Sequence, residues 1–361
     1  MKKNIVLIID SLAGGGAERS NIKIATMLVE QGYNVSVILI KNIIEFDFDK
    51  RINIIQLNYK RAMLSSVNNK KYASKLKIAI KTVEDKFGKI NFIAGSLGLT
   101  HKLMNLANID GYYVARDAIS VGQVGNRKGI KRLIKLWKLR KLYNNKKILT
   151  VSKGVEEDIL ELGIKPKTIQ TMYNPYDYEY IRSLSNEKID FDLPTEEYLV
   201  HVGRFEKQKN HTLLLNVFSK LQNKTIKLVL VGKGSDEEQL KNLVEKLNIK
   251  ERVIFSGFHK NPYPIIKNAK AFILTSEHEG LPTVLIEALA LNIPVVSTDC
   301  PSGPYEILTP ELKNYLCLLN DELCLIEKIN DILINPPQIP KSILTPYSVE
   351  TVLKEYKKLF N

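Results

Sequence analysis

The chain has 361 residues, of which 44% are hydrophobic and 25% charged. This composition excludes a disordered chain, and the length exceeds that of a domain with one ordinary hydrophobic core, so we expect two globular domains. The cysteines number only three and no apolar run approaches transmembrane length, which favours a cytoplasmic protein without a disulfide framework. The formal net charge of +14 is uneven, since residues 1–180 carry +15 and residues 181–361 carry −1, and this indicates an anionic partner for the first half.

The first half alternates short apolar runs with helical segments. Residues 5–9 predict a buried strand, and Asp10 ends this run too early for the core of a signal peptide. Such alternation predicts a doubly wound parallel sheet, whose ligands gather beyond the carboxyl ends of the strands, and Arg116 and Asp117 follow one such end. Further strands are predicted at 35–40, 52–57, 92–95, 114–115 and 148–151, and a helix at 72–86.

A glycine run joins the first predicted strand to a helix that extends to about residue 30. It consists of Gly14, Gly15 and Gly16, whose bare N–H groups beside a helix start suit an anionic ligand. An ordinary strand-to-helix turn is the alternative, although three glycines exceed what such a turn needs. The segment does not have the GxGxxG spacing of dinucleotide-binding proteins.

Residues 127–147 form a strongly basic segment that contains the only tryptophan of the chain. Wound as a helix, the segment has an apolar side formed by Ile130, Leu133, Ile134 and Trp137. Lysines on the other side suit docking on an anionic membrane surface. The membrane contacts predicted in this way are Lys131, Arg132, Lys135, Trp137 and Lys138. A surface helix whose apolar side packs on its own domain explains the same pattern equally well.

Residues 177–197 are polar and have no sustained strand, so we place the linker between the two domains there. After the linker, a strand at 198–202 ends in a glycine-opened loop that carries Arg204 and Lys209. Both cations can bind a diphosphate, Arg204 through its planar fork and Lys209 as a point charge. A solvated basic loop is the alternative, because lysine is common in this chain. Later strands are predicted at 227–231, 253–255, 271–275 and 295–297.

Two carboxylates mark the stretch from residue 274 to residue 308. Glu279 lies in the loop before a helix that starts near Pro282, and Glu287 lies eight residues later inside that helix. They are about two helical turns apart, so both can face one cleft and accept hydroxyl hydrogen bonds from a sugar or a ribose. Taken singly, Glu279 is an ordinary acid near a helix start and Glu287 a solvated helix residue.

Three sequence patterns together resemble the donor site of the glycosyl transferases group 1 family (glycosyltransferase family 4). They are E-G-L-P-x-x-x-x-E-A-L-A at 279–290, S-G-P-x-E at 302–306 and G-R-F-x-x-x-K-N at 203–210. The G-G-G-A-E-R-S segment at 14–20 resembles the first domain of this family. The resemblance implies the GT-B fold, with two Rossmann-like doubly wound parallel-sheet domains facing a central cleft. Residues 1–180 would then bind the acceptor, residues 181–345 the nucleotide sugar, and a last helix in 346–361 would pack back on the first domain.

The resemblance further implies a retaining transfer from a nucleotide-sugar donor, which we expect to be a UDP-sugar, at the inner face of the cytoplasmic membrane. The acceptor would be a hydroxyl of a lipid-linked or cell-surface glycan of the lipopolysaccharide, capsule or O-antigen type. The implied catalytic residues are Glu279, Arg204 and Lys209. The implied donor-binding residues are Gly15, Gly16, Gly203, Arg204, Lys209, Gly257, Phe258, Glu279, Gly280, Leu281, Pro282, Thr283 and Glu287. The implied acceptor-binding residues are Gly14, Arg116 and Asp117. At the strand end occupied by Arg116 and Asp117 the family often has a histidine, which this chain lacks.

Three other functions fit parts of the pattern. A nucleotide-sugar epimerase of the same fold would need no acceptor and no basic membrane helix, and a glycogen- or sucrose-type transferase leaves the basic first half unexplained. A nucleic-acid-binding protein fits the charge, but the lysines are not interleaved with stacking aromatics, so we predict no nucleic-acid partner. We also predict no cofactor and no metal, and interpret the D-x-D triplets at 47–49 and 190–192 as chance matches.

Overall fold

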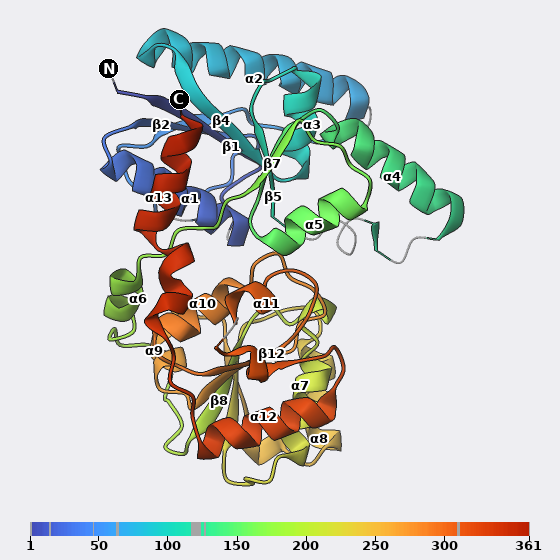
Figure 1. The fold of residues 1–361 in the computed structure, drawn as a ribbon, viewed down its shortest axis with the longest axis vertical. Helices are drawn as coiled ribbons and strands as arrows, with labels where there is room; N and C mark the ends of the chain where they lie inside the picture. Colours follow the sequence, from blue (N-terminus) through green and yellow to red (C-terminus); the bar gives the residue numbers. More distant parts are fainter. Residues whose placement is uncertain are drawn as a thin grey trace. The chain divides into compact units, whose positions relative to one another are not determined.

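The computed structural model of this protein describes residues 2–13, 16–45, 47–62, 65–116, 124–125, 128–308 and 311–360. The chain divides into two compact units, and each contains one parallel sheet covered by helices (Figure 1). Unit 1 comprises residues 1–176 and 346–361, whereas unit 2 is the single stretch 177–345.

Unit 1 contains a seven-stranded sheet in the order β3-β2-β1-β4-β5-β6-β7, and every pair of neighbours is parallel. The strand order reverses between β1 and β4, which is the switch point of a doubly wound sheet. The strands are β1 (Asn4–Ile9), β2 (Asn34–Leu39), β3 (Asn53–Gln56), β4 (Ile90–Ser96), β5 (Tyr112–Ala115), β6 (Lys147–Thr150) and β7 (Thr168–Thr171). The helices are α1 (Gly16–Glu30), α2 (Ser65–Phe87), α3 (Gly98–Leu106), α4 (Gly129–Tyr143), α5 (Lys153–Glu161) and α13 (Val349–Leu359).

Helix α13 completes the core of unit 1 although unit 2 separates it from the rest of this unit in the sequence. The ring of Phe360, directly after α13, lies 5.3 Å from the ring of Phe92 in β4 and 5.4 Å from that of Tyr33. Tyr356 contacts Phe92 from the same side, with ring centroids 6.0 Å apart. Since aromatic pairs of this kind bury large apolar areas, α13 is an integral part of unit 1.

Unit 2 contains a six-stranded sheet in the order β10-β9-β8-β11-β12-β13, again with parallel neighbours throughout. The order reverses between β8 and β11. The strands are β8 (Tyr198–Val202), β9 (Lys227–Val231), β10 (Val253–Gly257), β11 (Ala271–Leu274), β12 (Val295–Thr298) and β13 (Leu316–Cys317). The helices are α6 (Tyr178–Leu184), α7 (His211–Lys220), α8 (Glu237–Lys246), α9 (Tyr263–Lys267), α10 (Thr283–Ala290), α11 (Pro304–Ile307) and α12 (Glu322–Ile334).

The structure confirms the two doubly wound parallel sheets and adds elements that the sequence patterns do not predict. Four of them are α3, β7, β13 and α12. The segment predicted as a linker contains α6, whose Arg182 donates to the backbone carbonyl of Ala290 at 3.1 Å. The chain passes from unit 1 to unit 2 at residues 176 and 177, and back at residues 345 and 346. Among the described helices, we find none with the length and apolar character that a membrane crossing requires.

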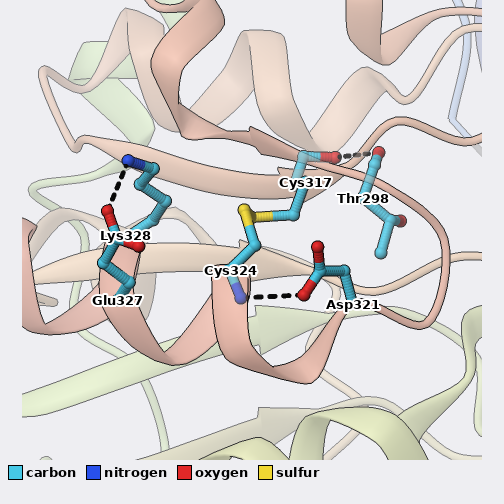
Figure 2. The surroundings of a disulfide bond; sticks show 7 residues. Thr298, Cys317, Asp321, Cys324, Glu327 and Lys328 are labelled. Carbon is cyan, nitrogen blue, oxygen red and sulfur yellow. Dashed lines mark hydrogen bonds and ion pairs between the residues drawn. A yellow bond between two sulfur atoms is a disulfide. The ribbon is translucent and has the colours of Figure 1, made fainter.

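The prediction that the cysteines form no disulfide is wrong. Cys317 at the end of β13 is bonded to Cys324 in the first turn of α12, and Figure 2 shows this disulfide with Asp321 beside it. The carboxylate of Asp321 caps α12 by accepting from the backbone N–H of Cys324 at 3.0 Å. This cap turns the chain back on itself, so that the two Cα atoms lie 5.7 Å apart, within bonding range. Cysteine number alone could not reveal this turn.

We expect the Cys324→Ser substitution to lower the free energy of unfolding by about 2 kcal/mol, because the disulfide restricts a short loop of the unfolded chain. Urea unfolding of the oxidised wild type and of the variant measures this difference. Dithiothreitol should lower the stability of the wild type to that of the variant and leave the variant unchanged. Equal stabilities of the two proteins without reductant would contradict the expectation.

Candidate functional site

Backbone hydrogen bonds at three glycines join the carboxyl ends of β8, β9 and β10 in unit 2. The N–H of Gly203 donates to the carbonyl of Val231 at 2.9 Å, and that of Gly232 donates to the carbonyl of Gly257 at 2.8 Å. Gly232 has a φ of +150°, and a Cβ atom there would lie 1.9 Å from the carbonyl oxygen of Gly203. Only glycine permits this approach at position 232, so Gly232 shapes the loop that begins at Gly203. The sequence analysis missed Gly232, whose signal was a glycine directly after the strand at 227–231.

A buried ion pair lies next to these strand ends. The ammonium of Lys209 is 2.6 Å from Oε1 of Glu279, and the two side chains are only 15% and 9% exposed. The hydroxyl of Ser276 donates to the same oxygen at 2.6 Å. Lys209 and Glu279, both predicted as catalytic, are therefore direct partners. Ser276, which the sequence analysis did not name, holds the Glu279 carboxylate beside Lys209.

Hydrogen bonds fasten the loop after β11 to the loop after β8. The side-chain amide of Gln208 donates to the carbonyl of His278 at 2.8 Å, and the N–H of Glu277 donates to the carbonyl of Gln208 at 2.8 Å. The hydroxyl of Thr275 donates to the carbonyl of Lys209 at 3.0 Å. These three bonds hold the Lys209–Glu279 pair in a fixed geometry, as a binding site built on rigid supports requires.

Arg204, the third residue predicted as catalytic, lies in solvent. Its side chain is 71% exposed and forms an ion pair of 3.0 Å with Glu206, two residues away. An exposed pair of this kind contributes at most about 1 kcal/mol. Arg204 can therefore exchange Glu206 for an anionic ligand at little cost, whereas Lys209 is already committed to a buried carboxylate.

Glu287 lies half-buried in α10, and Tyr263 of α9 donates to its Oε1 at 3.2 Å. The tyrosine restricts the orientation of the carboxylate. The sequence analysis missed Tyr263, because nothing in the chain marks a partner that lies 24 residues away.

The loop that leads into α10 contains the predicted donor-binding residues Gly280, Leu281 and Pro282, and Thr283 begins the helix. This loop packs against the turn before α11, where Gly303 has a φ of +99°. A Cβ atom on Gly303 would lie 2.3 Å from Cδ of Pro282 and 3.1 Å from Cα of Leu281. The close contact explains the pairing of the 279–290 and 302–306 patterns, since each loop supports the other.

At the end of β10, Gly257 and Phe258 form the remaining part of the predicted donor site. Gly257 has a φ of +79°, and the Phe258 ring that follows is exposed. The ammonium of Lys233 lies 5.3 Å from the centre of this ring. An exposed aromatic face beside a cation is a suitable surface for stacking a planar base.

Two buried histidines lie under the Lys209 loop. The rings of His201 in β8 and His211 in α7 are 4.5 Å apart. Burial lowers the pKa of His211 to about 4, with the charge of Lys209 acting in the same direction. Burial likewise lowers the pKa of His201. In unit 1, burial lowers the pKa of His101 to about 4, although its ring also contacts the carbonyl of Gly95. All three imidazoles are therefore neutral at pH 7.

These pKa shifts predict a loss of stability in mild acid. Between pH 6.5 and pH 4, His101 and His211 are protonated in the unfolded chain but stay neutral in the folded protein. The free energy of unfolding therefore falls as the pH falls. The expected loss is about 3 kcal/mol for each histidine over this window. Urea unfolding at a series of pH values measures it, and His101→Gln should flatten the slope of unit 1. A stability that rises on acidification would contradict the assignment.

In unit 1, Arg116 extends beyond the carboxyl end of β5 and joins two neighbouring segments. Its Nε donates to the Ser96 hydroxyl at 3.3 Å and its Nη1 to the side-chain oxygen of Asn174 at 3.0 Å. Asn21 of α1 donates to the same hydroxyl at 3.3 Å. This polar cluster can receive an anionic or hydroxyl-bearing group, and Ser96 and Asn174 are members that the sequence analysis missed. Gly16 begins α1, while Gly14, Gly15 and Asp117 lie outside the described residues.

Comparisons with known proteins bear on the family and the fold of this chain. Residues 183–343 match the family model described as Glycosyl transferases group 1. Over 374 aligned positions, covering 99% of both chains, the protein is 29% identical to an uncharacterized glycosyltransferase of Haemophilus influenzae. Over 187 positions, 52% of this chain and 50% of the relative, it is 34% identical to the N-acetylgalactosamine-N,N'-diacetylbacillosaminyl-diphospho-undecaprenol 4-alpha-N-acetylgalactosaminyltransferase of Campylobacter jejuni.

A solved structure of Anabaena HepE in complex with UDP and glucose superposes with a TM-score of 0.73 at 15% identity, covering 98% of both chains. At this identity the likeness shows the fold, and the chain has the GT-B fold, with its two parallel-sheet units. The match to the first curated relatives is partial, because the chain spans about half of their length.

Proposed function

We propose, from the match of residues 183–343 to the glycosyl transferases group 1 family model, that this protein is a glycosyltransferase. It moves a sugar from a nucleotide-sugar donor to a hydroxyl of a lipid-linked or cell-surface glycan, with the configuration of the sugar retained. A UDP-sugar is the proposed donor, in keeping with the UDP in the HepE structure. The lipid-linked acceptor is in keeping with the diphospho-undecaprenol named for the Campylobacter relative, and implies the inner face of the cytoplasmic membrane.

The buried Lys209–Glu279 pair is the observation that carries this proposal. It places a cation and a carboxylate 2.6 Å apart beyond the carboxyl ends of the strands, where open α/β sheets bind their ligands. A nucleotide sugar needs this combination, because its diphosphate is negative and its anomeric carbon becomes positive as the glycosidic bond breaks. Fixed charges aimed at such developing charge are usually the largest contribution to catalysis.

In the proposed mechanism, Lys209 and Arg204 neutralise the diphosphate as negative charge builds on the leaving group. Arg204 leaves Glu206 to do so, whereas Lys209 acts from its fixed position beside Glu279. The Glu279 carboxylate holds sugar hydroxyls and stabilises the positive anomeric carbon. No second carboxylate acts as a nucleophile.

The remaining groups bind the nucleotide. Glu287, restricted by Tyr263, accepts hydrogen bonds from the ribose hydroxyls, and the backbone at Gly257 and the ring of Phe258 receive the base. We propose that the reaction needs no metal, because Arg204 and Lys209 already supply two positive charges to the diphosphate.

Binding of a panel of nucleotide sugars in metal-free buffer tests this proposal. We expect saturable binding of one donor, loss of that binding in Glu287→Ala, and unchanged binding in Glu238→Ala, which removes an exposed glutamate from α8. Isothermal titration calorimetry measures the affinities, and analysis of the products detects slow hydrolysis of the donor. Conversion of the donor into its epimer without an acceptor would show an epimerase. Absence of all donor binding together with tight RNA binding would overturn the proposal.

A further inference from the structure

Helix α4 has two apolar faces, and only one of them packs on unit 1. Leu139 and Tyr143 are buried, and the Tyr143 hydroxyl lies 3.0 Å from Nδ1 of His101 in α3. Arg140 fixes the same end of the helix by donating to the carbonyl of Leu162 at 3.1 and 2.9 Å. The last turn of α4 is therefore anchored to the core, and the preceding turns extend from this anchor.

The second apolar face is exposed. It is formed by Ile130, Leu133, Ile134 and Trp137, of which Ile130 is 69% and Trp137 is 61% exposed. At 100° per residue these four side chains occupy an arc of about 100°, centred roughly opposite Leu139 and Tyr143. The face therefore points away from the core of unit 1. The alternative that this face packs on its own domain is wrong.

All charged residues of α4 are basic. They are Lys131, Arg132, Lys135, Lys138, Arg140 and Lys141. Lys131 and Lys138 border one side of the exposed apolar face, about 100° from its centre. Lys141 lies one turn beyond Trp137 on the same face, with its ammonium 5.3 Å from the centre of the Trp137 ring. A contiguous apolar face with lysines on its border matches the interface of an anionic bilayer, where apolar side chains enter the acyl boundary and ammonium groups meet phosphates.

We propose that the exposed face of α4, formed by Ile130, Leu133, Ile134 and Trp137 with Lys131 and Lys138 at its border, docks on the surface of an anionic lipid bilayer. The helix lies in the interface without crossing it, since its 15 residues are too few and too basic to span. The positive charge of α4 favours an anionic bilayer over a neutral one. A neutral bilayer can bury the apolar side chains, but it has no excess of anionic groups to bind the lysines. This inference involves no nucleotide sugar and so does not depend on the donor site.

Fluorescence of the full-length protein tests the inference, because Trp137 is the only tryptophan and lies in the docking face. Vesicles of phosphatidylglycerol and phosphatidylcholine at a 3:7 ratio should shift its emission to shorter wavelength, whereas pure phosphatidylcholine vesicles should not. The partition coefficient should fall as salt rises. Lys131→Glu/Lys138→Glu should lower it at least about 25-fold, since each lysine near an anionic surface is worth about fivefold.

Two control variants separate docking from general charge and hydrophobicity. Lys70→Glu/Lys77→Glu changes the charge of unit 1 equally, on the exposed side of α2, and should reduce the partition coefficient much less. Ile130→Ser/Leu133→Ser should weaken binding strongly, while Leu323→Ser/Ile334→Ser, at exposed apolar positions of unit 2, should not. Circular dichroism and donor binding show that each variant is folded.

Three outcomes would overturn the proposal. The first is unshifted Trp137 emission with anionic vesicles. The second is an equal loss of binding in the α2 and α4 charge variants, which would show attraction by net charge alone. The third is an emission shift that depends on protein concentration and not on lipid, which would show that the face covers a second copy of the chain. Each result leaves the donor-binding experiment unaffected, so failure of one proposal is distinguishable from failure of the other.

Discussion

Lys209→Met is expected to lower the free energy of unfolding of unit 2 by about 3 kcal/mol and the rate of sugar transfer about 10²- to 10³-fold. The stability falls because the Glu279 carboxylate, 9% exposed, loses its cation and keeps only the Ser276 hydroxyl among its described side-chain partners. In the proposed mechanism, the rate falls because the diphosphate loses a fixed positive charge in the transition state. Urea unfolding and initial rates with saturating donor measure the two effects separately.

Two further variants separate these effects. Lys209→Met/Glu279→Gln removes both charges and should recover most of the lost stability but none of the activity, since no buried charge is left unpaired. Arg204→Met, at an exposed position, should leave stability within about 0.5 kcal/mol of the wild type while activity falls. Wild-type stability and activity in Lys209→Met would refute the role of the pair.

Gly232→Ala is expected to destabilise unit 2 by about 3 kcal/mol and to weaken donor binding at the same time. The added Cβ would lie 1.9 Å from the Gly203 carbonyl oxygen, and the φ of +150° is unfavourable for any side chain. The chain can relieve the overlap only by moving the turn that carries Arg204. Thermal unfolding and calorimetric titration with the donor identified for the wild type measure both consequences.

Gly257→Ala is the matched control for this substitution. Gly257 also has a positive φ, +79°, but nothing lies within 4 Å of its added Cβ. We expect a loss of only about 1 kcal/mol from backbone strain. If the two alanine variants proved equally stable, strain rather than the contact with Gly203 would explain the effect of Gly232→Ala.

Local sequence patterns were sufficient for most of the fold, whereas the donor-binding role of the named residues stays a prediction. Apolar runs of four to six residues predicted the central strands of both sheets, because a parallel strand is buried on both faces. Glycine and proline marked the turns after β8 and before α10. Strand β13 was not predicted, because a strand of two residues is too short to show a periodic apolar pattern.

Partners that are distant in the sequence could not be predicted in the same way. The ion pair of Lys209 with Glu279 joins positions 70 residues apart, and only the packing of β8 against β11 brings their loops together. The Cys317–Cys324 bond also depends on three-dimensional structure, over a shorter distance in the sequence. The Asp321 cap sets the angle at which α12 leaves β13 and so brings the two cysteines together. For α4, periodicity revealed an apolar face, but it could not tell whether a core or solvent faces it.

The position of α13 determines an order of events during synthesis on the ribosome. Unit 2 is one continuous stretch and can fold as soon as residue 345 has emerged. Phe92 of unit 1 can stack on Tyr112 before that, but it gains its contacts with Tyr356 and Phe360 only after α13 has emerged. Domains generally fold as units while the chain is being made. Unit 1 is therefore begun first and completed last. Until α13 emerges, the nascent chain exposes the β4 surface around Phe92, which a chaperone can bind.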